Sequence, residues 1–285
     1  MKIGIQGGPG SFHEQAAREM FGVEAELFYG ATFAELYSEL FEGEVDLALT
    51  GVANNRYGSL AEPMAAVLTG KYCIVGETYV RVEHQLLGVR GSRLSDIKEV
   101  HSQVMALGQC NDFLQGPALQ KHVVRVEEDD TAGSARMVAE WSDPSKAAIA
   151  SRRAGELYGL EVIAENIQDD PDNLTRFLVL QRPSDFAPKT TDNKSTMLLT
   201  TGQAPGSLVN ALQPFKEYGV NIENLHSTFV PNTPFEIEFY MEVVAGLLDD
   251  RMKKILAVLE SQGCVVKQLG SYDRADIPTA GGDIV

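Results

Sequence analysis

The first fifty residues alternate short apolar runs with amphipathic segments, and this alternation restricts the chain to few folds. Apolar runs occupy about residues 3–6, 25–29 and 45–50, and the segments between them, about 12–21 and 33–41, have helical periodicity. A strand, a helix and a second strand in this rhythm normally pair in parallel through a right-handed crossover. The sequence therefore predicts an open α/β sheet at the N-terminus.

A second α/β pattern begins near residue 80. It contains apolar runs at about 86–89, 99–100, 123–126 and 147–150, with helical segments at about 104–114, 131–140 and 152–158. The apolar run 177–181 then predicts a return to the first sheet. We expect one lobe from about 1–79 and 165–182, a second from about 80–164, and a cleft between them.

The remainder of the chain predicts a separate module. Residues 183–194 are polar and contain two prolines, which is typical of a linker. A βαββαβ pattern follows over 195–275, with a tail at 276–285. Within 235–243 the alternation places Phe235, Ile237, Phe239 and Met241 on one face and the glutamates on the other. This pattern indicates a ferredoxin-like α+β module with helices on one face of its sheet.

The segment DNLTRF, residues 172–177, sets a hydroxyl beside a guanidinium where an apolar strand begins. Ligands of open α/β sheets collect where strands meet their loops, and a guanidinium binds carboxylates bidentately. Thr175 and Arg176 are therefore candidate site residues. The simpler alternative is that Thr175 is a strand-edge residue and Arg176 a surface charge.

The first strand runs into a glycine-rich turn, GGPGSFHEQAA, residues 7–17. Ser11 is placed to cap the following helix, and free amides at a helix start favour an anion. The spacing is neither GxGxxG nor that of a P-loop, so nucleotide binding is disfavoured.

Composition excludes several classes of protein. The net charge of −16 argues against nucleic-acid and anionic-membrane partners. There is no apolar leader and no apolar stretch long enough to span a bilayer, so we expect a cytoplasmic protein. Cys73, Cys110 and Cys264 are widely spaced without a CxxC pair, which indicates neither a disulfide framework nor a zinc site.

Taken together, the motifs resemble one family, the prephenate dehydratases. The two segments above, together with DDTAGSARMVAE (129–140) and AAIASRRAGELYGL (147–160), occur in that family's order and approximate spacing. The region after Thr191, including GSLVNALQPFKEYGVNIENL (206–225), resembles the ACT regulatory domain. The resemblance implies an α/β, two-lobed, periplasmic-binding-protein-like catalytic domain over 1–182, followed by a ferredoxin-like ACT domain.

The resemblance also implies an activity: decarboxylating dehydration of prephenate to phenylpyruvate, a carbon–oxygen lyase step in phenylalanine biosynthesis that needs no metal or organic cofactor. It places Thr175 at the departing hydroxyl and Arg176 on one carboxylate, with amides near Ser11 and Phe12 for the other. By the same resemblance the catalytic residues are Thr175, Asn54 and Gln103; the substrate-binding residues are Ser11, Phe12, Asn55, Ser102, Thr131, Arg176 and Phe177; and the regulatory residues are Gly206, Ser207, Leu208, Asn221, His226 and Ser227.

The chain departs from the family in two catalytic motifs. Gly51, Val52, Ala53, Asn54 and Asn55 stand where members usually read proline, isoleucine, glutamate, asparagine and serine. Gln103 occupies the place of a customary histidine. His101 lies nearby, but we expect it to point elsewhere, since neighbouring strand residues alternate in direction.

The regulatory loop departs as well. His226 stands for a usual glutamate, and Thr228 and Phe229 for arginine and proline. We therefore expect homodimers or homotetramers that form without ligand and respond weakly to phenylalanine as an amino-acid effector. Two alternatives stay open: an arogenate dehydratase or related prephenate lyase, and an amino-acid-sensing binding protein with impaired catalysis.

Overall fold

The computed structural model describes residues 1–117, 119, 123–230, 233 and 236–278. The chain divides into two compact units. Unit 1 is built from Met1–Gly58 and Tyr79–Phe177, and unit 2 from Ser59–Thr78 and Leu178–Asp276. Two strands, β5 (Cys73–Arg81) and β11 (Leu174–Gln181), run from one unit into the other.

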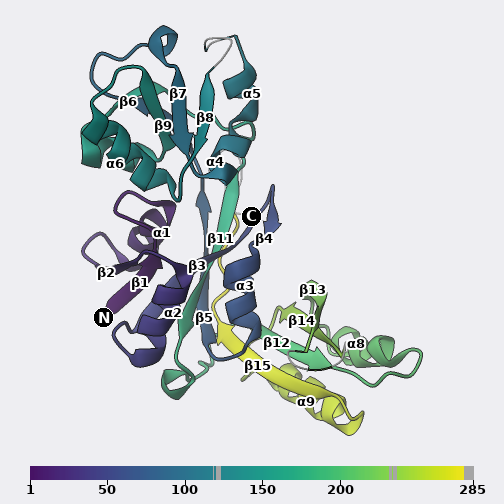
Figure 1. The fold of residues 1–285 in the computed structure, drawn as a ribbon. Coiled ribbons are helices and arrows are strands. Elements are labelled where there is room, and N and C mark those ends of the chain that lie inside the picture. The colour runs from purple at the N-terminus through teal and green to yellow at the C-terminus, as the bar shows by residue number, and fades with distance from the viewer. Residues whose placement is uncertain (118, 120–122, 231–232, 234–235, 279–285) are drawn as a thin grey trace. The chain divides into compact units, whose positions relative to one another are not determined.

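The first sheet of unit 1 has the predicted parallel order. Its central strand pairs in parallel with a strand on either side (Figure 1). The strands and helices are β1 (Lys2–Gln6), α1 (Phe12–Phe21), β2 (Glu26–Gly30), α2 (Phe33–Glu42), β3 (Leu47–Asn54) and the short β4 (Gly58–Ser59), which pairs with β3. Thr32 caps α2 by accepting from the Glu35 amide, while Glu35 accepts from the Ala31 amide. The Thr32 cap explains why the helix begins here, and Glu35 additionally holds the residue before the cap.

The second sheet of unit 1 has the strand order β10-β6-β9-β7-β8 and mixes parallel with antiparallel pairs. Its two faces are both covered. Leu86 and Ile149 pack toward α4 and α5, whereas Leu87 and Ala148 pack toward α6 and α7. The elements are β6 (Gln85–Gly88), β7 (Glu99–Ser102), α4 (Val104–Gln109), α5 (Asn111–Gln115), β8 (Val124–Glu127), α6 (Thr131–Trp141), β9 (Lys146–Ala150), α7 (Arg152–Tyr158) and β10 (Glu161–Ala164), with a 3₁₀ turn at Leu94–Asp96.

Three differences from the sequence prediction concern element boundaries. The helix expected over 104–114 is two short helices, because the backbone at Cys110 leaves the helical region. The sequence did not indicate α3 (Ala61–Leu68) or β10. Strand β11 begins at Leu174, so Thr175 and Arg176 lie within the strand rather than in the loop before it.

In unit 2 four antiparallel strands form a sheet in the order β13-β14-β12-β15, and both long helices pack on one face (Figure 1). The elements follow the predicted βαββαβ order: β12 (Lys194–Thr200), α8 (Ser207–Glu217), β13 (Ile222–Phe229), β14 (Ile237–Val243), α9 (Asp250–Ser261) and β15 (Val265–Tyr272). A 3₁₀ turn, Pro183–Asp185, lies in the expected linker. Phe235, expected on the apolar face, lies outside the described residues.

Strand β15 continues this sheet onto β5, with Gly270 opposite Ile74. A Cβ atom at Gly270 would lie 2.1 Å from the Ile74 carbonyl oxygen, so only glycine permits this approach. Unit 2 thus contains Ser59–Thr78 besides the C-terminal module. The domain boundaries taken from the sequence stay a prediction.

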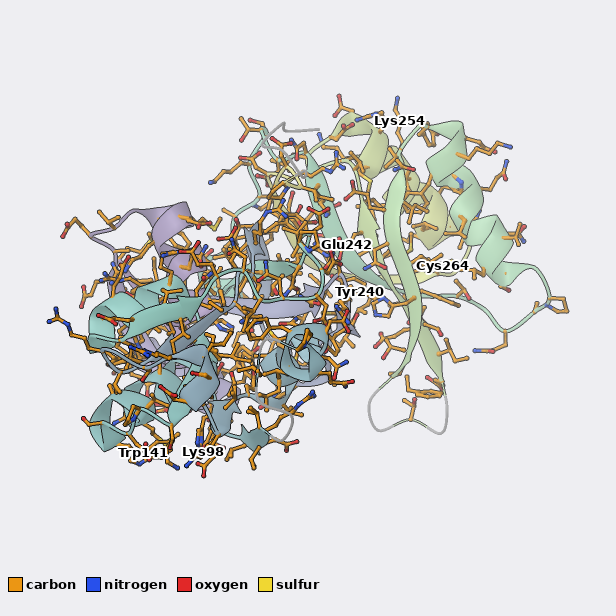
Figure 2. All side chains as sticks on the ribbon, turned by 90° about the horizontal axis from the view of Figure 1, so that it is seen from above. Lys98, Trp141, Tyr240, Glu242, Lys254 and Cys264 are labelled. Carbon is orange, nitrogen blue, oxygen red and sulfur yellow. The ribbon has the colours of Figure 1, made fainter. Side chains whose placement is uncertain are left out.

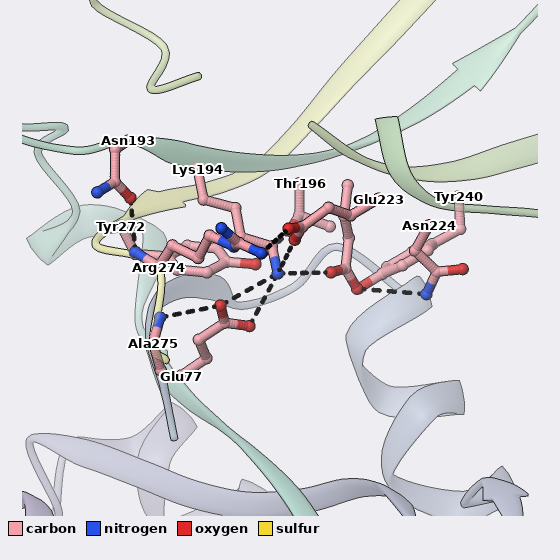
Figure 3. A network of polar contacts seen from close by, with 11 residues as sticks. Glu77, Asn193, Lys194, Thr196, Glu223, Asn224, Tyr240, Tyr272, Arg274 and Ala275 are labelled. Carbon is pink, nitrogen blue, oxygen red and sulfur yellow. Dashed lines mark hydrogen bonds and ion pairs between the residues drawn. The ribbon is translucent and has the colours of Figure 1, made fainter. Parts of the chain in front are cut away.

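Two glutamates of β14, Glu238 and Glu242, are buried, and Glu242 packs against a buried lysine, Lys194 (Figure 3). Lys194 is 1% exposed, and its Nζ lies 3.0 Å from Glu77 Oε2, 2.9 Å from Glu223 Oε2 and 3.0 Å from Glu242 Oε2. Tyr240 and Glu242, two positions apart on β14, point to the same face, and the Tyr240 hydroxyl donates to Glu242 at 2.8 Å (Figure 2). We call these residues the Lys194 cluster. Removing one partner from an ion pair this deeply buried leaves an uncompensated charge and is strongly destabilising.

No helix in the described part of the chain is long and apolar enough to cross a membrane.

Candidate active site

Strand β11 is held against the end of β3 by Asn55. The Asn55 amide donates to the Leu174 carbonyl at 3.0 Å, and its side-chain oxygen accepts from the Leu174 amide at 3.0 Å. Its Nδ2 donates to the Asp172 carbonyl at 2.6 Å. The Asn55 side chain, a candidate substrate ligand, is therefore occupied in aligning the segment that carries Thr175.

Asn54, buried at the end of β3, contacts Thr175 directly. Its Nδ2 lies 3.1 Å from Thr175 Oγ1 and 2.7 Å from Asn173 Oδ1. Its Oδ1 accepts from the Arg56 and Tyr57 amides at 3.0 and 3.2 Å, which fixes the orientation of the amide group. Because Thr175 Oγ1 accepts from Asn54, the threonine O–H remains available to donate to another acceptor.

The contacts continue away from Thr175 through three more side chains. Asn173 Oδ1 also accepts from Gln109 Nε2 at 3.3 Å, and Gln109 Oε1 lies 2.6 Å from His84 Nε2. Asn173, Gln109 and His84 are all buried, with exposed fractions of 0%, 5% and 1%. Burial lowers the pKa of His84 to about 4, so the ring is neutral at pH 7. We call Thr175, Asn54, Asn173, Gln109 and His84 the Thr175–His84 network.

Phe12, a predicted site residue, borders this network. Its ring meets the His84 ring edge-on, with centroids 5.4 Å apart. Phe12 is the first residue of α1, and Ser11 caps that helix as predicted by accepting from the Glu14 amide at 3.2 Å. The Ser11 amide itself donates to the Gly8 carbonyl at 3.1 Å. Of the two amides expected to bind a carboxylate, that of Phe12 is the better placed.

A carboxylate of the chain already occupies part of the glycine-rich turn. Glu14 is 4% exposed; it accepts from the Gly10 amide, and its Oε1 lies 2.6 Å from Arg18 Nε. Burial raises the pKa of Glu14, but the bonds from Gly10 and Arg18 outweigh burial and lower it overall. Glu14 is therefore ionised and stabilises the turn. Its carboxylate already accepts from the Gly10 amide, so this amide does not bind an external anion.

His13 and Phe177 belong to the packing behind the site. His13 Nε2 accepts from the Gly51 amide at 3.2 Å, and its ring meets Phe177 edge-on at 5.1 Å. Burial lowers the pKa of His13 to about 4. A Cβ atom at Gly51 would lie 3.3 Å from the Phe177 ring, and a proline there would lack the N–H that His13 accepts. Glycine at position 51, where family members usually have proline, therefore leaves room for the Phe177 ring and supplies the N–H that His13 accepts.

The candidate residues of the second lobe are Ser102, Gln103 and Thr131, and they lie in the sheet and at the helix starts of that lobe. Ser102 is fully buried, and its hydroxyl donates to the Ile149 carbonyl at 2.6 Å, so this hydroxyl is committed to the sheet. Gln103 stands at the start of α4, where its carbonyl accepts from the Leu107 amide. Thr131 is the first residue of α6, which Asp130 caps.

His101 points away from the site, as expected. Its Nδ1 lies 2.9 Å from Glu128 Oε1 and its Nε2 3.2 Å from Glu99 Oε2. Its ring lies 4.7 Å from that of Trp141, which Figure 2 shows at the margin of the molecule. His101 therefore does not replace the customary histidine.

Arg176 and Thr175 are consecutive in β11, so their side chains leave the strand on opposite faces. The clamp role of Arg176 stays a prediction. The loop before Thr175 is braced by Arg81, whose Nη1 lies 2.7 Å from both the Pro171 carbonyl and Asp172 Oδ1. The sequence did not single out Arg81, because a basic residue in a strand has no local signal.

A separate cavity of about 850 Å³ opens on unit 1 between α1, β5 and α7. Its charged lining is mixed rather than cationic, since guanidinium groups alternate with carboxylates. The charged residues that line it are Glu14, Arg18, Glu19, Arg81, Glu83, Arg152, Arg153 and Glu156.

Three of the predicted regulatory residues, Gly206, Ser207 and Leu208, line a hollow of about 280 Å³ at the start of α8, together with Ile237 and Phe239. The other three lie around β13. His226 stacks on Tyr240 with centroids 4.7 Å apart, Ser227 is paired with Phe239 across the sheet, and the Asn221 carbonyl accepts from the Val244 amide. Burial lowers the pKa of His226, and nearby Glu242 partly offsets this effect.

An α/β unit with two sheets and a threonine hydroxyl held by a buried amide network is typical of proteins that act on or bind small molecules. A prephenate dehydratase family model matches residues 3–185. The bifunctional chorismate mutase/prephenate dehydratase of Neisseria gonorrhoeae is 30% identical over 96% of this chain and 75% of its own length.

Two further relatives agree. The arogenate dehydratase/prephenate dehydratase 1 of Arabidopsis thaliana is 32% identical over 95% of this chain and 72% of its own length. The structure of an Arthrobacter aurescens prephenate dehydratase in complex with L-Phe is 28% identical, has a TM-score of 0.85, and is matched over 99% of this chain and 93% of its own. The chain belongs to the prephenate dehydratase family, and the predicted fold class and enzyme class, a carbon–oxygen lyase, are confirmed.

Proposed function

We propose that this chain converts prephenate to phenylpyruvate, with Thr175 at the departing hydroxyl. The observation that carries the proposal is the bond from Asn54 Nδ2 to Thr175 Oγ1, which leaves the threonine O–H available to donate to the substrate. In the reaction the bond to the ring carboxylate breaks, and its electron pair enters the ring. The C–O bond breaks at the same time and hydroxide leaves. A proton taken up from solvent converts the hydroxide to water, so the products are carbon dioxide, water and phenylpyruvate.

Aromatisation of the ring drives this reaction, so the protein need only hold the substrate and stabilise the departing oxygen. An alcohol is a poor acid, and Thr175 therefore acts by hydrogen bonding to the oxygen as negative charge develops on it. An oriented donor is worth more in a site that excludes water than in solution. The Phe12 amide and Arg176 are the proposed partners of the two substrate carboxylates.

Prephenate and arogenate differ in the side chain, where arogenate carries an ammonium group in place of the keto oxygen. The Arabidopsis relative is named for both substrates. The glutamate that this chain lacks is replaced by Ala53, which removes a carboxylate that would attract a cation. This change favours prephenate over arogenate. The sensor alternative leaves unexplained why a hydroxyl and its orienting amide are retained.

We propose that an amino acid is the effector of unit 2, bound at the hollow lined by Gly206, Ser207 and Leu208. An amino acid carboxylate suits the amides that follow Ser207 at the start of α8, an eleven-residue helix, while the Ser207 amide itself donates to the Ala204 carbonyl at 3.1 Å. The related Arthrobacter structure contains L-Phe. His226 and Thr228 weaken such a site here, because they replace the acid and the cation expected beside an amino acid. The proposed assembly is a homodimer or homotetramer.

The proposal is tested by incubating purified protein with prephenate and following phenylpyruvate, with arogenate and release of phenylalanine in a parallel assay. We expect turnover of prephenate at least tenfold faster than that of arogenate, roughly a 1.4 kcal/mol preference. Faster turnover of arogenate would reassign the substrate. Binding of prephenate without turnover of either compound would favour the sensor alternative.

A further inference from the structure

The Thr175–His84 network has a fixed order of donors and acceptors. The Asn54 oxygen faces two backbone N–H groups, so its nitrogen faces Asn173, the Leu174 carbonyl at 3.1 Å and Thr175. The Asn173 oxygen is then an acceptor from both Asn54 and Gln109. Gln109 donates to Asn173 through its nitrogen, so its oxygen is the atom that faces His84.

This order determines which ring nitrogen of His84 carries the proton. An amide oxygen only accepts, so the 2.6 Å contact with Gln109 requires a proton on His84 Nε2. The ring is neutral, and Nδ1 is therefore a bare acceptor. Nδ1 is buried and has no hydrogen-bond partner among the residues that the structure describes. One tautomer is thus held by a single strong contact in an apolar setting that includes the Phe12 ring.

We infer that His84 is a positioning residue for the reaction: its Nε2–H holds the Gln109 amide, Gln109 and Asn173 hold the Asn54 amide, and Asn54 orients the Thr175 hydroxyl. This inference rests on the proposed function of Thr175. The network draws on four places in the chain: Gln109 lies in α4, Asn173 in the loop before β11, Asn54 in β3 and Thr175 in β11. It therefore also connects the two lobes of unit 1. A side chain in such a network controls geometry rather than transferring protons.

His84 does not act as the acid itself. Three amide side chains separate it from Thr175, and amides do not relay protons readily. Its bare Nδ1 is buried, so a proton from solvent has no open route to it. The effect of removing His84 should therefore appear in kcat through misplacement of Thr175, and substrate binding should change little.

The test is a double-mutant cycle with a conservative control. His84→Gln keeps a nitrogen donor near the position of Nε2, whereas His84→Leu removes it at similar volume. We expect His84→Leu to lower kcat by roughly tenfold to a hundredfold with KM within about twofold, and His84→Gln to retain most of kcat. In a Thr175→Ala background, His84→Leu should lower kcat by less than about twofold, because the hydroxyl that it positions is gone.

An unchanged kcat in His84→Leu would overturn the inference. So would an equal loss of kcat with and without Thr175, since that result indicates general destabilisation. Nitrogen NMR of the His84 ring provides a readout independent of activity: we expect protonated Nε2 and bare Nδ1 between pH 6 and 8. If the wild type is active but NMR places the proton on Nδ1, the positioning role of His84 is wrong and the proposed function stands. If the wild type turns over neither prephenate nor arogenate, the proposed function is wrong, and so is the role of His84.

Discussion

Asn54 Nδ2 lies 3.1 Å from Thr175 Oγ1, although 121 residues separate the two positions along the chain. The contact forms because β11 begins beside the end of β3, with Asn55 aligning the two strands. A hydroxyl that accepts from a fixed amide must donate in a direction other than toward that amide. This relationship leaves the Thr175 O–H available as a hydrogen-bond donor.

Arg176 should affect substrate binding more than turnover. Lysine keeps the positive charge but loses the planar fork that binds a carboxylate through two hydrogen bonds. We expect Arg176→Lys to raise KM by roughly tenfold, about 1.4 kcal/mol, with kcat nearly unchanged. Steady-state kinetics with prephenate measure both constants. A KM equal to that of the wild type would make Arg176 a structural residue.

Lys194 should be needed for stability. Lys194→Met leaves three buried or half-buried carboxylates, Glu77, Glu223 and Glu242, without the ammonium that they surround. Leaving buried charge uncompensated costs about 3–5 kcal/mol. We expect the free energy of unfolding, measured with urea, to fall by about that amount. Lys253→Met is the matched control, because Lys253 is 57% exposed and pairs only at the surface with Asp250. Equal effects of the two substitutions would contradict this account of the cluster.

Phenylalanine should bind weakly to the wild type. His226 is stacked on Tyr240, and Thr228 is a short hydroxyl, so neither supplies the charge that an amino-acid ligand would meet in the family's loop. Calorimetric titration should show no micromolar binding. The double substitution His226→Glu with Thr228→Arg should tighten binding. Micromolar affinity of the wild type, with loss of prephenate turnover, would show this interpretation of the loop to be wrong.

The buried histidines predict a loss of stability in mild acid. Burial lowers the pKa of His84 from 6.5 to about 4, so between these values the unfolded chain binds a proton that the folded protein does not. Stability therefore falls as pH decreases from 6.5 toward 4 and levels off below, by roughly 2 kcal/mol between pH 7 and 5 for this residue. His13 acts in the same direction.

The control is His84→Gln, which cannot titrate. Urea unfolding at pH 7 and pH 5 should show a smaller loss for the variant than for the wild type, by roughly 2 kcal/mol. An identical loss in both proteins would mean that His84 does not titrate as its burial implies.

Strand and helix periodicity predicted most of the elements of both units, because apolar alternation is a local property of the chain. The predicted parallel order of β1, β2 and β3 is confirmed, as is the Ser11 cap of α1. What the sequence could not supply was pairing at long range. His84 had no motif around it, yet it contacts Gln109 and Phe12 once the lobes fold.

The same limit explains the residues whose placement differs from expectation. Ser102 sits in a family motif, but its hydroxyl bonds to a neighbouring strand that the motif does not include. The glutamates of β14 alternate as an exposed face would, and the ion pair with Lys194 on β12 accounts for the burial of Glu242. In each case the burial and orientation of the side chain depend on a partner that lies far away in the sequence.

The most direct test of the central claim is the kcat of Thr175→Ala beside that of Thr175→Ser, with prephenate as substrate and folding checked by circular dichroism. Serine keeps a hydroxyl at the same place and alanine removes it. If the Asn54-directed hydroxyl assists the departing oxygen, Thr175→Ala should lower kcat and kcat/KM together by roughly a hundredfold or more, while Thr175→Ser stays within about tenfold of the wild type. A kcat of Thr175→Ala equal to that of the wild type would contradict the account.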